Sequence, residues 1–210
     1  MTAFDDAFRE RLRELILWRR DVRRFRPDPL PDGVVERLLE QASLAPSVGL
    51  SQPWRFVLIE EAARRAAVRA GFERCNADAL ASYAGERAQR YARLKLAGLD
   101  AAPVHLAVFA DRDTAQGHGL GRHTMPEMAE YSAVMAIHTL WLVARAEGLG
   151  LGWISILDPP EVTRILEVPA EWIFLGYFCL GYPESDEATP ELQRQGWEQR
   201  RPWQEFVTRR

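Results

Sequence analysis

A nearly uniform apolar helix constrains the fold of this chain more than any other segment. Apolar side chains fill most of residues 131–144, and the run lies between Pro126 and Gly148, which suit the start and the end of a helix. It is shorter than a membrane span and includes Ser132 and His138. A helix that is apolar on nearly all sides must be buried on several of them. We therefore expect it to lie in the core, with a second subunit among its neighbours.

Length and composition describe a single domain, expected to span residues 1–210, with 47% apolar and 27% charged residues. The formal net charge of -3 gives no reason to expect nucleic acid or a membrane as a partner. The only cysteines, Cys75 and Cys179, exclude a disulfide framework and a thiolate zinc site. Residues 4–10 are charged where a secretory signal would be apolar. These features predict a cytoplasmic protein.

Shorter segments predict the other elements. Asp32 is placed to cap the helix that follows it. The order of elements predicts an α+β domain with a small sheet and helices on its faces. The sequence patterns predict helices at residues 4–18, 34–42, 60–100 and 161–167, and strands at residues 56–59, 104–110, 148–156 and 172–180.

Two segments are expected to lie outside the core. Residues 72–98 are weakly patterned, which favours a peripheral helical excursion that serves as a lid. Residues 184–210 are polar apart from Trp197 and Trp203. Such a tail is more easily explained as an arm over a neighbouring subunit than as disorder.

Five arginines and one carboxylate lie within residues 18–26. So dense a positive cluster repels itself unless an anion binds there, and guanidinium groups suit bidentate contacts with phosphate. We expect Arg19, Arg20 and Arg23 to hold a phosphate, and Asp21, inside their field, to have a separate role. The alternative is a solvated basic surface in which Asp21 balances local charge.

A second candidate segment, residues 45–54, is rich in small and turn residues. Such a loop lets backbone amides approach a ligand, and Ser47, Ser51 and Gln52 can supply hydrogen bonds. The alternative is a plain connection between a helix and a strand.

Several common sites are excluded. The four histidines, His105, His118, His123 and His138, lack the spacing of a zinc site, and His105 and His138 are expected in the core. The glycines at 148, 150 and 152 fit neither a dinucleotide fingerprint nor a Walker loop. Any nucleotide is therefore held by arginine side chains and small-residue loops.

Four motifs, in order, resemble those of the nitroreductase family of FMN-binding proteins. Residues 19–25 are similar to its R-R-S-x-R-x-F signature, except that Asp21 replaces the usual Ser. The other three motifs are residues 45–54, 147–150 and 181–183. Residues 94–96, 120–127 and 152–157 further resemble the branch of this family that makes 5,6-dimethylbenzimidazole, the lower ligand of cobalamin.

This resemblance implies a nitroreductase-like fold with a mostly antiparallel sheet, and a homodimer with swapped C-terminal arms and two FMN sites at its interface. It implies that reduced FMN is the substrate, fragmented with O2 to 5,6-dimethylbenzimidazole and erythrose 4-phosphate. A separate flavin reductase would supply the reduced FMN, and direct use of NAD(P)H is left open. The implied FMN-binding residues are Arg19, Arg20, Asp21, Val22, Arg23, Ser47, Gln52, Ser155 and Arg200.

Asp21, Ser155 and Gly49 carry the chemistry that the resemblance implies, with Gly49 leaving space for O2 beside the flavin. Breaking the flavin requires proton movement, for which a carboxylate is more useful than a hydroxyl. We expect the surrounding arginines to keep Asp21 ionised, and Ser155 to donate a hydrogen bond. Two alternatives remain: an NAD(P)H-dependent nitroreductase or flavin reductase, and a flavin-binding protein without catalysis.

Overall fold

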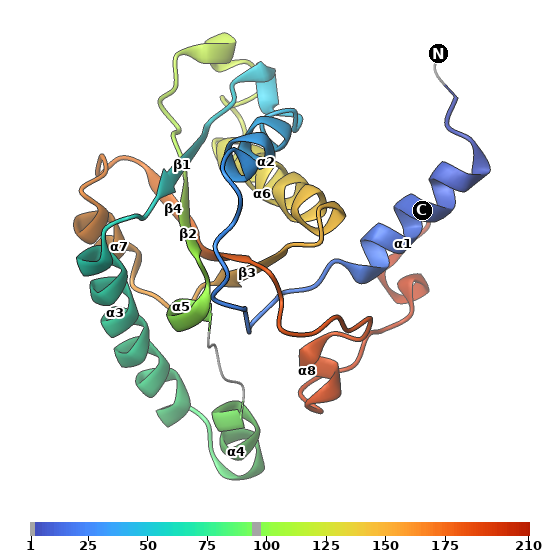
Figure 1. Ribbon diagram of the computed structural model, residues 1–210. Helices are drawn as coiled ribbons and strands as arrows, with labels where there is room; N and C mark the ends of the chain where they lie inside the picture. The colour runs from blue at the N-terminus through green and yellow to red at the C-terminus, as the bar shows by residue number, and fades with distance from the viewer. Residues whose placement is uncertain (1–2, 94–97) are drawn as a thin grey trace.

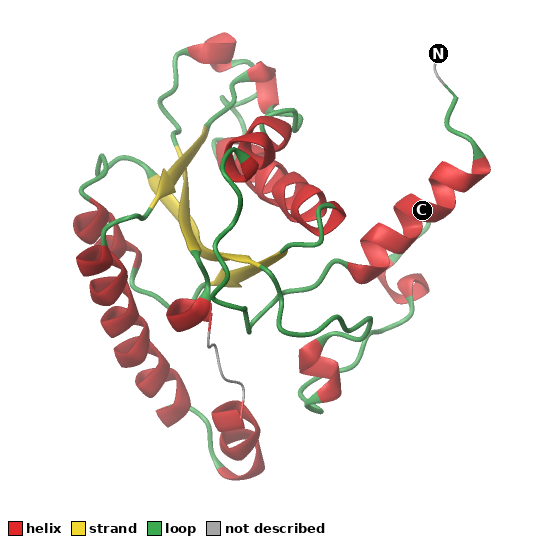
Figure 2. Cartoon of the chain, viewed as in Figure 1, coloured by secondary structure: helices red, strands yellow, loops and turns green. Residues whose placement is uncertain are grey.

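Four antiparallel strands form the centre of the computed structural model, which describes residues 3–93 and 98–210 (Figures 1 and 2). Their order in the sheet is β1-β2-β4-β3, so the two central strands are β2 and β4. The sheet and its helices confirm the predicted α+β class. The strands are β1 (Trp54–Leu58), β2 (Val104–Ala110), β3 (Gly150–Ile154) and β4 (Ile173–Gly181).

Helices cover both faces of this sheet (Figure 1). On one face, α2 (Val34–Ala42) and α6 (Met128–Ala146) pack on alternate residues of the strands, such as Leu106 and Phe178. The other face is covered by α3 (Ala62–Ala81), α5 (Gly98–Ala101) and α7 (Pro159–Leu166). Side chains alternate between the faces of a strand, so each central strand supplies both cores.

The predicted elements are largely confirmed, with two differences. The helix α2 begins after Gly33, whose φ is 77°, and no side chain caps it, so the prediction that Asp32 caps this helix was wrong. The expected helical region at 60–100 is divided into α3, α4 (Gly85–Arg93) and α5. Gly85, with φ of 58°, is the first residue of α4.

The N-terminal helix α1 (Asp6–Trp18) extends away from the body of the molecule (Figure 1). Asp5 caps it by accepting a hydrogen bond from the Phe8 amide at 2.8 Å. None of its residues is buried, although Phe8, Leu12 and Ile16 lie along one side. A short helix gains most of its stability from packing of its apolar face, and the described chain leaves much of that face of α1 exposed.

The helix α6 is buried along one face. Ala133, Ile137 and Leu140 are fully covered, whereas Tyr131 and Met135 remain 53% and 44% exposed. His138 is also exposed, so the prediction that it lies in the core was wrong. None of the described helices is long and apolar enough to cross a membrane.

His105 lies in the core, as predicted, and is 2% exposed. Its Nδ1 is 2.9 Å from the hydroxyl oxygen of Tyr177 on the neighbouring strand β4. Burial, with a smaller effect of the Arg65 cation, lowers the pKa of His105 to about 4. The imidazole is therefore neutral in the folded protein at physiological pH.

This histidine should make the fold sensitive to acid. In the unfolded chain His105 binds a proton below pH 6.5, whereas the folded chain resists protonation down to about pH 4. Stability should therefore fall as the pH decreases through this window, by about 3 kcal/mol in all. Urea unfolding at pH 7 and pH 5 measures the loss. A His105→Gln variant, which cannot titrate, should lose less stability over the same interval; an equal loss would assign the acid sensitivity to other groups.

Candidate functional site

The segment that carries the arginines runs along the outer edge of the sheet. Asp21 forms a parallel bridge with Leu151 of β3, and the Val22 amide donates to the Leu151 carbonyl at 3.1 Å. Two glycines of β3 permit this close approach. A Cβ atom on Gly152 would lie 2.1 Å from the Val22 carbonyl oxygen, and one on Gly150 would lie 2.6 Å from a methyl group of Val22. The glycines therefore fix where Asp21 lies.

A Gly152→Ala substitution should push residues 21–23 away from β3. Overpacking of this kind costs about 1 to 3 kcal/mol of folding stability, and here it should also displace Asp21. Thermal unfolding and ligand titration measure the two effects. Gly71→Ala is the matched control, because its Cβ would meet only the flexible end of Glu161 at 3.2 Å and alanine favours helix. Equal stability of both variants would contradict the proposed role of Gly152.

Asp21 is held from two directions. Its Oδ1 accepts a hydrogen bond from the Trp153 amide at 2.9 Å, and its Oδ2 lies 3.5 Å from Nε of Arg23. The side chain is 37% exposed, on the side that faces the cavity described below, and protein encloses it elsewhere. Burial raises the pKa of Asp21, and the Trp153 amide and Arg23 only oppose that rise. The expectation that the surrounding arginines keep this carboxyl ionised stays a prediction: Arg23 acts in that direction, and lost hydration acts against it with the larger effect.

The structure brings three of the predicted arginines together. Arg19 lies over the ring of Trp141 at 5.0 Å, and the Arg20 carbonyl accepts a hydrogen bond from Nε1 of that indole at 2.9 Å. Arg200, from the C-terminal segment, lies close enough to affect both residues. Burial first, and then the Arg200 charge, lower the pKa of Arg19 and Arg20. Mutually repelling cations of this kind favour a bound anion.

One atom of this cluster lacks a partner. Nε of Arg20 is buried and makes no hydrogen bond within the described residues. Arg23 differs from the other arginines, because it is turned toward Asp21. The candidate anion site of the described chain therefore comprises Arg19, Arg20 and Arg200, whereas Arg23 pairs with the carboxylate.

A cavity of about 120 Å³ lies beside this cluster. One wall comes from the segment with Arg20, Asp21 and Val22, and the opposite wall comes from residues 183–195, which include Thr189 and Glu191. The site therefore joins the start of the fold to its C-terminal segment.

Ser155 lies just beyond the end of β3 and is exposed. It follows Trp153, whose amide binds Asp21, by two residues, or about 7 Å of extended chain. The side chains of Asp21 and Ser155 thus lie along the same edge of the sheet. No contact between them is present in the described part of the chain.

The second predicted segment is an ordered loop containing a short 3₁₀ helix, Val48–Leu50. The Ser47 hydroxyl accepts from the Gln52 amide at 3.1 Å, and the Val48 amide donates to the hydroxyl of Ser132 on α6 at 3.0 Å. Gly49 has φ of 56°, and a Cβ there would lie 3.0 Å from Leu120. Glycine is thus required here by the chain itself, and its predicted role toward O2 stays a prediction.

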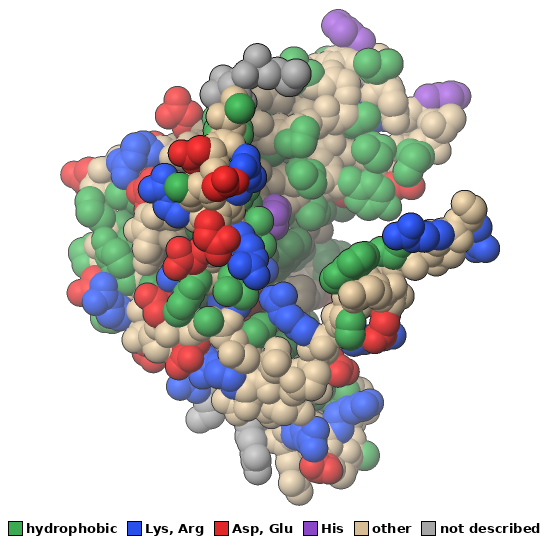
Figure 3. Space-filling model, turned by 90° about the vertical axis from the view of Figure 1, so that its right-hand side faces the viewer, with side chains coloured by type: hydrophobic (Ala, Val, Ile, Leu, Met, Phe, Trp, Pro, Cys, Tyr) green, Lys and Arg blue, Asp and Glu red, His purple; other side chains and the backbone are tan. Residues whose placement is uncertain are grey.

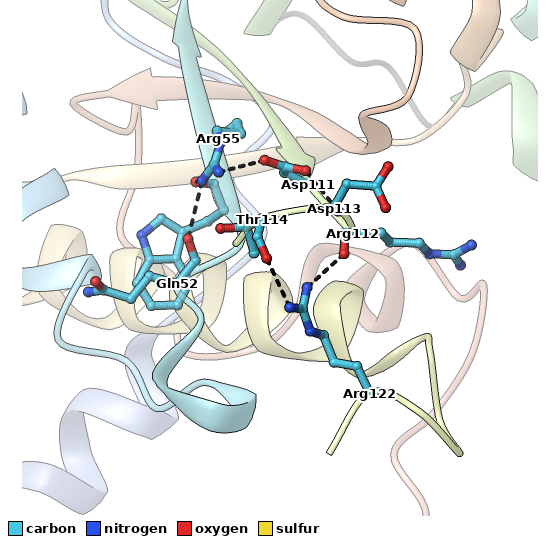
Figure 4. A network of polar contacts seen from close by, with 8 residues as sticks. Gln52, Arg55, Asp111, Arg112, Asp113, Thr114 and Arg122 are labelled. Atoms are coloured by element: carbon cyan, nitrogen blue, oxygen red, sulfur yellow. Dashed lines mark hydrogen bonds and ion pairs between the residues drawn. The ribbon is translucent and has the colours of Figure 1, made fainter. Parts of the chain in front are cut away.

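A polar network fixes this loop to the end of the sheet (Figure 4). Arg55 pairs with Asp111 at 2.6 Å and also donates to the Gln52 carbonyl at 3.2 Å. Arg122 donates to the carbonyls of Arg112 and Thr114 at 2.6 and 2.9 Å, which closes the neighbouring loop. The residues at 120–127 that resembled one branch of a family thus have a local structural role. Residues 94–96, which contributed to the same resemblance, lie outside the described residues.

The two predicted halves of the site lie at opposite ends of α6. Ser132 holds the second loop at the start of this helix, and Trp141 and Arg145 lie beside the arginine cluster near its end. Thirteen residues of helix separate Ser132 from Arg145, or about 20 Å. Among the described residues, the cavity at Asp21 is lined by no residue of the loop at 47–52. Within one chain the two candidate segments therefore lie apart.

Two tryptophans of this site were not predicted from the sequence. Trp141 and Trp153 pack together with ring centroids 6.1 Å apart, and they hold the Arg20 carbonyl and the Asp21 carboxylate respectively. Large aromatic side chains are also expected at ordinary core positions, so the sequence alone did not mark these two residues as part of the site. Only the pairing of residues 21 and 151 shows that they lie beneath the arginine segment.

Comparison with known proteins gives one consistent result. Residues 16–182 match the model of the nitroreductase family. The chain is similar to a 5,6-dimethylbenzimidazole synthase of Rhodospirillum rubrum, with 59% identity over 95% of this chain and 94% of the relative. It is also similar to a protein of the same name from Rhodobacter capsulatus, with 51% identity over 95% of this chain and 96% of the relative.

Solved structures share the fold at lower identity. An iodotyrosine deiodinase bound to FMN and 3-iodo-L-tyrosine superposes with a TM-score of 0.71 and 24% identity, over 84% of this chain and 91% of the other. A nitroreductase-like protein of Streptococcus mutans superposes with a TM-score of 0.70 and 17% identity, over 96% and 98%. These similarities place the sheet and helices in a known architecture.

Proposed function

The chain belongs to the nitroreductase family, and we propose that it fragments reduced FMN with O2, yielding 5,6-dimethylbenzimidazole and erythrose 4-phosphate. The observation that carries this proposal is the partly buried Asp21 carboxylate beside an arginine cluster, in a chain 59% identical to a 5,6-dimethylbenzimidazole synthase. Nitroreductases commonly have a serine hydroxyl at this position, which cannot serve as a general base at neutral pH.

The described residues fit the FMN phosphate. Arg19, Arg20 and Arg200 supply forked donors, and the buried Nε of Arg20 still lacks an acceptor. A phosphate would remove the repulsion among these cations and satisfy that donor. The N-terminus of a helix is not used, because α1 presents its C-terminal end here. Binding therefore depends on the arginine side chains. Val22 lines the same cavity through its place beside β3.

Asp21 is suited to accept and return protons. Burial raises its pKa above that of an ordinary aspartate, which makes the carboxylate a stronger base. The Trp153 amide holds Oδ1, so Oδ2 is the oxygen that exchanges a proton, with Arg23 beside it. The bound flavin supplies the reducing electrons and the bonds that break. Ser155, further along the same edge, is assigned a hydrogen bond to the reacting flavin.

We propose a homodimer in which the second loop of one chain completes the site at Asp21 of the other. Several exposed apolar surfaces support this assembly, because large exposed patches mark interaction sites. The C-terminal segment, exposed at every position from 198 to 210, projects from the body, with a gap between it and the upper part of the molecule (Figure 3), and fits the proposed arm. The large exposed apolar residues of the described chain are Phe4, Phe8, Leu12, Ile16, Leu17, Leu44, Leu50, Leu58, Leu80, Leu120, Met125, Tyr131, Val134, Met135, Trp203, Phe206 and Val207.

The helix α4 supports a lid over the site, as part of the predicted lid at 72–98. Tyr83 and Tyr91 pack against Trp197, with ring centroids 5.7 and 6.2 Å from it. Arg90 donates to the Gly196 carbonyl at 2.8 Å. Burial raises the pKa of Tyr91, and the nearby Arg23 charge opposes that rise, so this helix lies close to the catalytic segment. A closed site excludes water from the reaction.

The test is chemical. Purified protein given excess reduced FMN in air should form 5,6-dimethylbenzimidazole, detected by mass spectrometry, with FMN consumed. A cytoplasmic flavin reductase with NAD(P)H should replace chemically reduced FMN in this assay. No dimethylbenzimidazole, together with rapid oxidation of NAD(P)H and intact FMN, would instead assign the chain to the flavin reductases or nitroreductases. Binding of FMN without turnover of either kind would leave a non-catalytic flavin-binding protein.

A further inference from the structure

Gln52 is held at almost every polar atom. Its backbone amide donates to the Ser47 hydroxyl at 3.1 Å, and its carbonyl accepts from Arg55 at 3.2 Å. Its side-chain Oε1 accepts from Nε2 of Gln116 at 2.8 Å. Its own Nε2 has only a contact of 3.5 Å with the Ser43 carbonyl, at the outer limit of a hydrogen bond. The side-chain NH2 group is thus the part of Gln52 that remains available as a donor.

The direction of both amide groups follows from a third atom. Nε2 of Gln116 also lies 2.8 Å from the carbonyl oxygen of Leu50. A backbone carbonyl can only accept, so the Gln116 atom facing it must be the amide nitrogen. The Gln52 atom that shares this nitrogen must then be an acceptor, which is Oε1. The amide orientation of Gln52, ordinarily ambiguous, is determined by Leu50.

We propose that Gln116 is a positioning residue: it fixes which end of the Gln52 side-chain amide is the NH2 group, so that this group can donate a hydrogen bond to an acceptor on the flavin ring. This inference rests on the proposed function, in which Gln52 contacts FMN. Gln116 itself is exposed, and no other described contact of its side chain amide is present beyond Leu50 and Gln52. Gln52 has φ of 42°, so the chain also maintains an unusual backbone conformation to place this side chain.

Two substitutions separate this role from simple packing. Gln116→Met keeps the size of the side chain and removes the donor, so the Gln52 amide is free to rotate. Gln116→Lys keeps a donor for the Leu50 carbonyl oxygen and for Oε1 of Gln52, and its side chain cannot accept a hydrogen bond. This variant should therefore retain the orientation of the Gln52 amide. We expect FMN to bind about three- to tenfold more weakly to the Met variant, the value of one hydrogen bond, and nearly normally to the Lys variant.

The measurement is FMN affinity, with the absorbance spectrum of bound FMN as a second readout. The spectrum of the Met variant should shift, and that of the Lys variant should match the parent. Normal binding and an unchanged spectrum in the Met variant, or weakening in the Lys variant alone, would overturn the proposal and indicate packing. Gln116→Glu removes the donor in a second way and should weaken binding too. Because both readouts need no turnover, they test Gln116 even if the protein forms no 5,6-dimethylbenzimidazole.

Discussion

An Asp21→Asn variant should bind FMN with nearly parental affinity and form 5,6-dimethylbenzimidazole about 10²- to 10⁴-fold more slowly, the usual range for loss of a general base. Asparagine is similar in shape, and its Oδ1 can still accept from the Trp153 amide, which holds Asp21 at 2.9 Å. The backbone pairing with β3 uses Leu151 and does not depend on the carboxylate. The substitution should therefore remove proton exchange while the site keeps its geometry.

The pH dependence provides a more specific test of this assignment. Burial raises the pKa of Asp21, so the acid limb of product formation should lie above the range of an ordinary aspartate. An Asp21→Glu variant keeps a titrating group and should retain a displaced acid limb, which should be absent in Asp21→Asn. Single-turnover assays across pH 4 to about 8 measure this. A parental rate in Asp21→Asn at any pH would exclude Asp21 from proton transfer.

Replacing Arg19 and Arg200 together by alanine should weaken FMN binding by a hundredfold or more. Each residue would lose charge-assisted hydrogen bonds to the phosphate, worth roughly 1.5 to 3 kcal/mol apiece. Arg23 is kept because it pairs with Asp21, and its loss would mix binding with catalysis. Isothermal titration with FMN and with riboflavin gives the measurement. Affinity for riboflavin, which lacks the phosphate, should change little.

The control for this double variant removes the same net charge elsewhere. Arg69 and Arg164 have side chains that are 51% and 75% exposed, and they lie on α3 and α7, away from the site. Exposed ion pairs contribute little to stability, so their double alanine variant should fold and bind FMN normally. If the control weakened binding as much as Arg19 and Arg200 do, the effect would be a long-range charge effect and the phosphate assignment would be wrong.

Sequence reasoning predicted the fold well where side-chain pattern decides structure. The apolar run of β2 extends over Val104–Ala110 as predicted, because both faces of a central strand are buried. Sequence reasoning was less successful where the structure depends on the conformation of one residue or on which surfaces the folded chain covers. The cap predicted at Asp32 is absent because Gly33 adopts a left-handed conformation, and the exposure of His138 depends on a surface that the chain leaves uncovered.

The candidate site was predicted in its residue types and only partly in its arrangement. The arginine cluster and Asp21 are recognisable because so many like charges in a row require an anion. The raised pKa of Asp21 cannot be recognised from the sequence, since it depends on how closely β3 and Trp153 enclose the carboxylate. The role of Gln116 was also inaccessible, because it lies 64 residues from Gln52 along the chain.

The length of α6 has a consequence for the genetics of the enzyme. One end of this helix holds the loop with Gln52 and the other adjoins Asp21. In the proposed homodimer, a defect at either end would therefore affect a different half of each site. In a mixed dimer of an Asp21 mutant and a Gln52 mutant, one site should carry both defects and the other neither. Two inactive alleles expressed together should then restore up to half of the activity per mixed dimer.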